Sequence, residues 1–181
     1  RYLEDVYSAD PVPREGLQDE CEILVVGAGF AGLLLWYRLS QAGFNDVRFC
    51  EKGGDVGGTW YWNRYLVAMC DTDSLIYLPL LEETGYLPSE KYTRGPDILE
   101  HCPRIARHFD LYRDAVFSTE VTGLTWDDAD RQWVIATNRG DRLRARHVCV
   151  GTGPLHKAKL PGIPGIEEFA GHSFHPSRWD Y

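Results

Sequence analysis

A glycine-rich turn, residues 27–32, lies between an apolar run and a segment with helical spacing. The run at residues 23–26 is typical of a strand that is buried on both faces of a parallel sheet. Apolar residues then recur at helical spacing over residues 33–39, and Gly43 is placed to end that helix. Residues 47–51 form a second strand-like segment, so the sequence predicts one βαβ unit.

Each glycine of the turn has a separate physical task. Gly27 permits the tight turn, Gly29 lets a pyrophosphate approach the backbone, and Gly32 allows helix and strand to pack closely. The helix N-terminus offers unpaired N–H groups to the anion. The alternative is a turn with only a structural purpose. We predict a dinucleotide site formed by Gly27, Ala28, Gly29, Phe30, Ala31 and Gly32.

The residues after the turn indicate which dinucleotide is bound. Glu51 ends the second strand and can accept hydrogen bonds from both ribose hydroxyls, whereas a 2′-phosphate would be repelled, so the site predicts FAD or NAD and excludes NADP. Glycines at 53–54 and 57–58 then keep the chain close, and they lead into the aromatic residues 60–62. The ribityl chain and ring of a flavin would lie where such a loop runs, whereas a plain NAD dehydrogenase has no need of it. FAD is therefore favoured. An aromatic cluster that merely packs is the alternative.

The remaining pattern predicts a Rossmann-like α/β domain with a parallel sheet, helices and a small β-meander. Residues 97–112 have helical spacing, which we expect Pro103 to kink or restart. Residues 121–126, 133–137 and 142–150 are strand-like and are separated by turn formers. We expect an N-terminal arm at 1–20, an FAD-binding domain at 21–153 and a linker at 154–181 that leads toward an NADPH domain absent from this chain.

Composition and charge exclude several classes of protein. The net charge of −8 has no basic stripe, so no nucleic acid partner is expected. The five cysteines form neither a CxxC pair nor a disulfide framework, which favours reduced thiols in a cytoplasmic protein. No run approaches the roughly 20 apolar residues that cross a bilayer, so no membrane partner is expected. His172 and His175 lack a zinc-like partner, and no metal is predicted.

Two longer motifs give the chain a family resemblance. The segment 58–65, Gly-Thr-Trp-Tyr-Trp-Asn-Arg-Tyr, closes with Cys70-Asp71 and is similar to the segment after the second FAD strand in type I Baeyer–Villiger flavin monooxygenases. The turn 151–153 is similar to the one that closes the first FAD segment in two-nucleotide flavoproteins. The family fingerprint FxGxxxHxxxW(P/D) is matched at Phe169, Gly171, His175, Trp179 and Asp180. The resemblance covers about residues 20–181 and looks nearest to the fungal members over residues 78–92.

This resemblance implies an enzyme that uses FAD, NADPH and O₂ to insert one oxygen atom beside a ketone carbonyl, giving an ester or lactone. It implies that Asp71 lies beside the flavin and orients an active-site arginine, and that His175 couples domain movement to catalysis. It also implies flavin contacts by Thr59, Trp60, Asp71 and Tyr77, and a backbone contact from Val121 to adenine.

The chain departs from the family pattern in two respects. Leu66-Val67 stand where the family usually has Pro-Gly, which leaves the path of the loop that carries Asp71 open. A second GxGxxG motif, the NADPH domain and a catalytic arginine segment are missing. We therefore expect the isolated chain to be inactive and to need its C-terminal remainder or a partner polypeptide. The alternatives are a non-catalytic FAD-binding or interaction subunit, and an N- or S-oxidising flavin monooxygenase.

Overall fold

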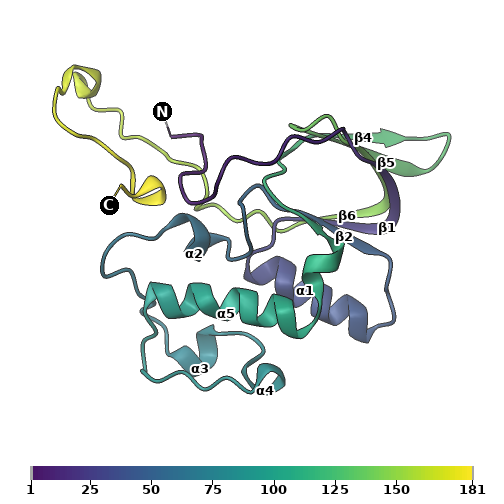
Figure 1. The fold of residues 1–181 in the computed structure, drawn as a ribbon, viewed down its shortest axis with the longest axis horizontal. Helices are drawn as coiled ribbons and strands as arrows, with labels where there is room; N and C mark the ends of the chain where they lie inside the picture. The colour runs from purple at the N-terminus through teal and green to yellow at the C-terminus, as the bar shows by residue number, and fades with distance from the viewer. Residues whose placement is uncertain (1, 181) are drawn as a thin grey trace.

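The computed structural model describes residues 2–180, so Arg1 and Tyr181, the outer ends of the expected arm and linker, lie outside the described residues. A single mixed sheet organises the chain, with helices along it (Figure 1). In chain order the elements are β1 (Gln18–Val26), α1 (Phe30–Gln41), β2 (Val47–Cys50), α2 (Thr59–Trp62), α3 (Ser74–Tyr77), α4 (Leu81–Thr84), α5 (Gly95–His108), η1 (Leu111–Asp114), β3 (Ala115–Val116), β4 (Val121–Asp127), β5 (Gln132–Thr137), β6 (Arg142–Val150), η2 (Ile166–Glu168) and η3 (Pro176–Arg178).

The strand order of the six-stranded sheet is β3-β2-β1-β6-β5-β4. Strand β1 is central and runs parallel to both β2 and β6, with Ile23 beside Val47 on one side and His147 on the other. Strands β4, β5 and β6 form an antiparallel meander. The carboxyl ends of β1, β2 and β6 therefore meet at one edge, and the predicted Rossmann-like α/β fold is confirmed.

Helices α1 and α5 cover one face of the sheet and pack against each other (Figure 1). Alternate residues of β1 and β2 face them, as the period of two in a strand requires. The resulting apolar cluster includes Val25, Leu33, Phe49 and Ile105, each almost completely buried. A second cluster on the opposite face joins Leu24 of β1 to the meander. Both faces of the second half of β1 are thus buried, which explains the unbroken apolar run at residues 23–26.

Helix α5 includes Pro103 within one continuous helix, so the expected restart at this residue is wrong, whereas the kink stays a prediction. Proline inside a helix removes one hydrogen bond and costs about 3 kcal/mol. Burial of Ile98, Cys102 and Ile105 against the neighbouring elements offsets that cost. The α-helix ends at His108 rather than Tyr112, because Asp110 adopts a left-handed backbone with φ of 55°.

Strand β1 begins at Gln18, five residues before the apolar run of residues 23–26, and so inside the segment expected to be an arm. Its first three residues are exposed and gave no apolar signal, but they pair in register with the start of β6, from Gln18 beside Arg142. The extra length is therefore dictated by the partner strand. The division of the chain into arm, domain and linker stays a prediction.

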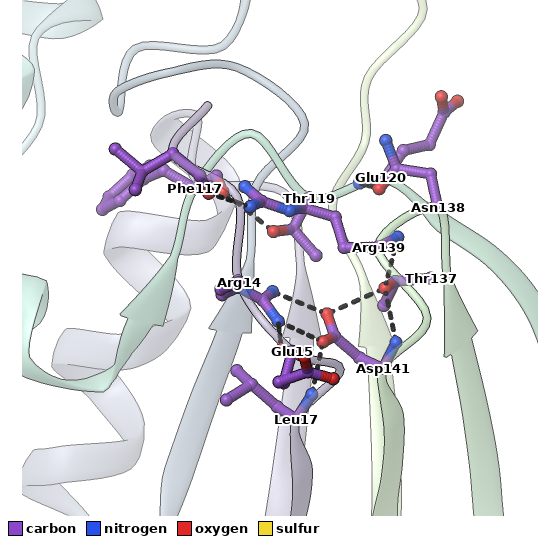
Figure 2. Close-up of polar contacts among 11 residues, drawn as sticks. Arg14, Glu15, Leu17, Phe117, Thr119, Glu120, Thr137, Asn138, Arg139 and Asp141 are labelled. Atoms are coloured by element: carbon purple, nitrogen blue, oxygen red, sulfur yellow. Dashed lines mark hydrogen bonds and ion pairs between the residues drawn. The ribbon is translucent and has the colours of Figure 1, made fainter. Parts of the chain in front are cut away.

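Figure 2 shows how the segment before β1 is held on the turn between β5 and β6. The Asp141 side chain is buried and forms a two-pronged ion pair with the Arg14 guanidinium, in which Nη2 lies 2.8 Å from Oδ2. The same carboxylate accepts hydrogen bonds from the Leu17 amide at 2.7 Å and the Thr137 hydroxyl at 2.8 Å. The Arg139 side chain donates to the Val12 carbonyl. These bonds order the arm without an apolar core of its own.

The contact between Gly32 of α1 and the carbonyl of Gly27 sets the distance between helix and strand. A Cβ at residue 32 would lie 2.1 Å from the Gly27 oxygen, a backbone atom that cannot move aside easily. We predict that Gly32→Ala lowers the free energy of unfolding by about 1–3 kcal/mol, as overpacking does. Urea denaturation measures the change. Gly162→Ala is the matched control, because its Cβ would meet no atom within 4 Å; equal stability of the two variants would contradict the prediction.

The ion pair between Arg14 and Asp141 predicts a defined pH dependence of stability. The Arg14 hydrogen bonds hold the pKa of the Asp141 carboxyl well below its usual range. Its stabilisation is therefore complete above the unfolded-state pKa of about 4 and is lost as the pH falls below it. We expect Asp141→Asn to cost about 2–3 kcal/mol at pH 7, with the difference from the parent chain shrinking below about pH 4.

Urea unfolding at a series of pH values tests this prediction, with Asp19→Asn as the control. Asp19 forms an ion pair with Arg48 that is largely exposed on both sides, so its loss should cost less than about 1 kcal/mol. A difference for Asp141→Asn that stays constant on acidification would show that the ionised carboxylate is not its source.

Candidate functional site

The glycine-rich turn lies where the carboxyl ends of β1, β2 and β6 converge. The Gly27 amide donates to the Cys50 carbonyl at 2.9 Å, and the Gly151 amide donates to the Val26 carbonyl at 2.8 Å. Gly27 has a φ of 100°, a conformation that side chains other than glycine rarely adopt. The tight turn expected at Gly27 is therefore present. It places the N-terminus of α1 at the carboxyl ends of the strands.

A second glycine segment packs directly against this turn. The Gly57 amide donates to the Ala28 carbonyl at 3.0 Å, and a Cβ on Gly58 would lie 2.7 Å from the Gly29 Cα. Glycine is thus required at residue 58, and a Cβ on Gly29 would also be tight, at 3.2 Å from the Gly58 Cα, a reason that the motif alone does not reveal. The two glycine segments together leave backbone, rather than side chains, at the centre of the site.

Glu51 is buried at the end of β2 beside the turn. Its Oε2 accepts from the Ala28 amide at 2.6 Å and its Oε1 from the Gly53 amide at 2.7 Å. Burial raises the pKa of the Glu51 carboxyl, and the two amide donors partly oppose that rise. A carboxylate has about four acceptor positions, so two hydrogen bonds leave room for further donors. Glu51 therefore fixes the two glycine segments and still faces the hollow next to it.

Three adjoining hollows run over the turn. The first, about 200 Å³, contains Glu51, Val121 and Gly29. The second, about 610 Å³, shares Gly29, Gly58 and Thr59 with the first and extends to Phe30, Trp60 and Tyr77. The third, about 530 Å³, shares Thr59, Trp60 and Tyr77 with the second and reaches Asp71. Neighbouring hollows share lining residues, and Thr59 lines all three, so we describe them together as one trough that contains glycine backbone.

Aromatic side chains line the trough where the second and third hollows meet. The Trp60 indole donates from Nε1 to the Tyr77 hydroxyl at 2.8 Å, and their rings meet edge to face. The Phe30 ring lies 5.4 Å from the Tyr77 ring. Burial raises the pKa of Tyr77, so its hydroxyl stays protonated at neutral pH. These rings give this part of the trough a hydrogen-bonded aromatic wall.

Asp71 is exposed at the far end of the trough. Its carboxylate makes no hydrogen bond or ion pair with another residue in the range 2–180. The loop that carries it contains Val67, which is exposed and has a φ of 58°. Valine in this conformation is strained, yet the backbone keeps the left-handed form that glycine at this place in the family pattern would adopt freely. The departure from Pro-Gly therefore leaves Asp71 beside Trp60 and Tyr77 in the third hollow.

His175 is not brought to the trough, although the next residue, Pro176, lines it. Its Nδ1 accepts from the Ser177 amide at 3.1 Å, so the ring caps the short helix η3. The ring also lies 6.3 Å from that of Tyr2 in the N-terminal arm. The structure thus separates the two residues for which a catalytic role was expected: Asp71 faces the trough and His175 anchors the linker.

Several residues of the trough were missed by the sequence analysis. Lys52 and Glu120 form an ion pair at 3.2 Å beside the Glu51 end. Thr119, His156 and Lys157 line the same hollow. The one signal among them was the position of Lys52, which directly follows Glu51. Their meeting depends on the strand order, which brings distant segments to the same edge.

No helix among residues 2–180 has the length and apolar content to cross a membrane. Over the same range, no group of three or more His, Cys, Asp or Glu side chains is arranged to hold a metal ion. All five cysteines are free thiols.

Comparison with known proteins places the chain in a family. Residues 24–181 match the profile described as pyridine nucleotide-disulphide oxidoreductase. A Baeyer–Villiger monooxygenase of Streptomyces coelicolor is 52% identical over 99% of this chain, which covers 30% of that protein. The polycyclic ketone monooxygenase of the thermophilic fungus Thermothelomyces thermophila is 38% identical and superimposes with a TM-score of 0.89, over 99% of this chain and 31% of that one.

A second similar structure is OTEMO in complex with FAD and NADP, which is 35% identical with a TM-score of 0.82 over 88% of this chain and 30% of that one. The chain thus spans about 30% of the length of the relatives it matches. Both bacterial and fungal proteins are among them. With its fold and its strand-end trough, the chain belongs to the pyridine nucleotide-disulphide oxidoreductase family and is similar to the FAD-binding part of Baeyer–Villiger monooxygenases.

Proposed function

We propose that this chain is the FAD-binding part of a Baeyer–Villiger monooxygenase. The observation that carries the proposal is the trough, which combines a buried acid, glycine backbone and an aromatic wall in adjoining hollows. A dinucleotide offers matching parts: a ribose, a diphosphate and planar rings. Gly29, Gly58 and Gly151 line both of the first two hollows, and such backbone without side chains fits a diphosphate.

The residues around the trough have distinct proposed tasks. Glu51 accepts hydrogen bonds from the adenosine ribose and repels a 2′-phosphate, which favours FAD over NADP at this site. The uncapped N-terminus of α1 faces the diphosphate with its free amides. Thr59, Trp60 and Tyr77 contact the flavin, and Val121 at the start of β4 offers backbone to the adenine. The sites of similar enzymes, which hold FAD and NADP in OTEMO, support this assignment.

The whole reaction is proposed on the same grounds. Bound FAD, reduced by NADPH, supplies electrons that activate O₂ for insertion beside a ketone carbonyl. Asp71 is well placed to orient a positively charged group beside the flavin, because its carboxylate is open on the trough side. His175 anchors η3 and so holds the linker in register with the trough. In this proposal, NADPH binding and the ketone pocket require segments outside the 30% of the relative's length that this chain matches.

The Glu51 assignment predicts weaker retention of FAD in Glu51→Gln. One of the two backbone amides that Glu51 now binds would face the glutamine NH₂ group, and the charged acceptor for ribose is lost. We expect a loss of about 1–3 kcal/mol in FAD binding, read by flavin absorbance after dialysis and by titration of the apoprotein. Glu83→Gln is the control, since Glu83 also accepts a side-chain hydrogen bond but lies outside the trough. Full flavin retention in Glu51→Gln would contradict its proposed contact with ribose.

The proposed reaction predicts activity for a chimera in which this chain replaces the matching third of the Streptomyces coelicolor relative. With NADPH, ¹⁸O₂ and a panel of ketones, we expect one labelled oxygen atom in an ester or lactone, detected by mass spectrometry. Asp71→Asn should lower kcat about 100-fold, as loss of orientation at the reacting centre does, while FAD stays bound.

The matched control is Asp73→Asn, because Asp73 caps α3 through an oxygen that asparagine retains. A chimera that is fully loaded with FAD but gives no oxygenated product would instead favour a non-catalytic FAD-binding subunit. Oxygenation of an amine or a sulfide with no ester or lactone from any ketone would favour an N- or S-oxidising enzyme.

A further inference from the structure

Arg178 is a buried arginine for which the proposed chemistry has no use. It lies in η3, directly before Trp179, and is only 5% exposed. It forms no salt bridge with any residue in the range 2–180. Its three nitrogens donate instead to backbone carbonyls: Nε to Glu4 at 2.7 Å, Nη1 to Ser177 at 2.6 Å and Nη2 to His156 at 3.4 Å. A buried charge needs such contacts, because it has lost its solvent.

The same guanidinium also lies on helix α2. Its Cζ is 4.2 Å from the centroid of the Trp62 ring, a distance at which cation and ring attract each other. Trp62 is buried and ends α2, the helix that begins with Thr59 at the trough. One side chain therefore contacts three segments that are far apart in the sequence: the arm, the linker and α2. Desolvation in this setting lowers the pKa of Arg178.

Asp5, next to Glu4 in the arm, holds the other side of the same loop. Its Oδ2 accepts from the Tyr61 hydroxyl at 2.6 Å and from the Gly54 amide at 3.0 Å. The Tyr61 ring packs edge to face on Trp62, with centroids 5.0 Å apart. Consecutive arm residues thus bind the Arg178 guanidinium on one side and the glycine loop on the other.

We propose that Arg178 is a positioning residue that couples the linker to α2 and to the N-terminal arm, so that these segments loosen together when Arg178 is released. Arg178 is bonded to the histidine of the family fingerprint through the turn of η3, because the Arg178 amide donates to the His175 carbonyl at 2.7 Å. A displacement of the linker at His175 therefore acts on Arg178, and through it on the loop beside the trough. The coupling of these segments does not depend on the proposed function. Only the assignment of the loop to flavin binding rests on it.

Hydrogen exchange of the 181-residue chain without flavin tests the coupling. In Arg178→Met the side chain keeps much of its length but loses the charge and the donors. We expect peptides covering residues 2–9 and 56–64 to exchange about tenfold faster than in the parent chain, as local opening becomes easier. Arg104→Met is the matched control: the Arg104 Cζ lies 4.1 Å from the Tyr86 ring centroid, but the residue contacts neither segment. It should leave both peptides unchanged.

Arg178→Lys decides the question if the methionine variant does not fold. Lysine keeps the charge but has no planar fork, so it cannot stack on Trp62 and reach the Glu4 and Ser177 carbonyls together. We expect partial rescue, with both peptides exchanging about threefold faster than in the parent chain. Unchanged exchange of either peptide in the variant that folds, or faster exchange confined to residues 172–180, overturns the proposal. Because no flavin is present, failure of the FAD assignment leaves this result intact.

Discussion

Close contact between glycine backbones at the carboxyl ends of the parallel strands is the constraint on which the rest of the structure depends. Gly32 lies on the Gly27 carbonyl, and Gly29 lies on Gly58, in both cases at distances that leave no room for a Cβ. Helix α1 can therefore pack close to the sheet, and residues 57–58 can pack against its N-terminus. The elongated trough exists because these segments meet without side chains between them.

Glu51 makes one part of the trough chemically different from the rest. Its carboxylate binds the Ala28 amide of the glycine-rich turn and the Gly53 amide of the loop that follows β2, so the acid that lines the first hollow also joins these two segments. The hydrogen-bonded pair of Trp60 and Tyr77 lies where the second and third hollows meet. One part of the trough is therefore polar and another is aromatic. This asymmetry supports the proposed dinucleotide, whose ribose and flavin ring differ in the same way.

The two ends of the described chain meet at the loop that forms one wall of the trough. The arm contributes Asp5, the linker contributes Arg178, and the paired rings of Tyr61 and Trp62 lie between them. Figure 1 shows the two ends on the same side of the sheet, above α2. Neither end has an apolar core, so each owes its order to hydrogen bonds and ring contacts made with the domain. The geometry of the loop thus depends on contacts that span almost the whole sequence.

The sequence by itself determined the βαβ unit, the meander, the tight turn at Gly27 and the close packing at Gly32, because periodicity and glycine content report local backbone requirements directly. It also pointed to Glu51 and, through the family resemblance, to Trp60, Tyr77, Val121 and Asp71, all of which line the trough. Tertiary structure alone decided that α5 continues through Pro103, that Val67 takes a left-handed backbone and that Gly29 meets Gly58. It also decided that Lys52 and Glu120 join the site. These features follow from long-range contacts whose energies outweigh local preference, and no local pattern records them.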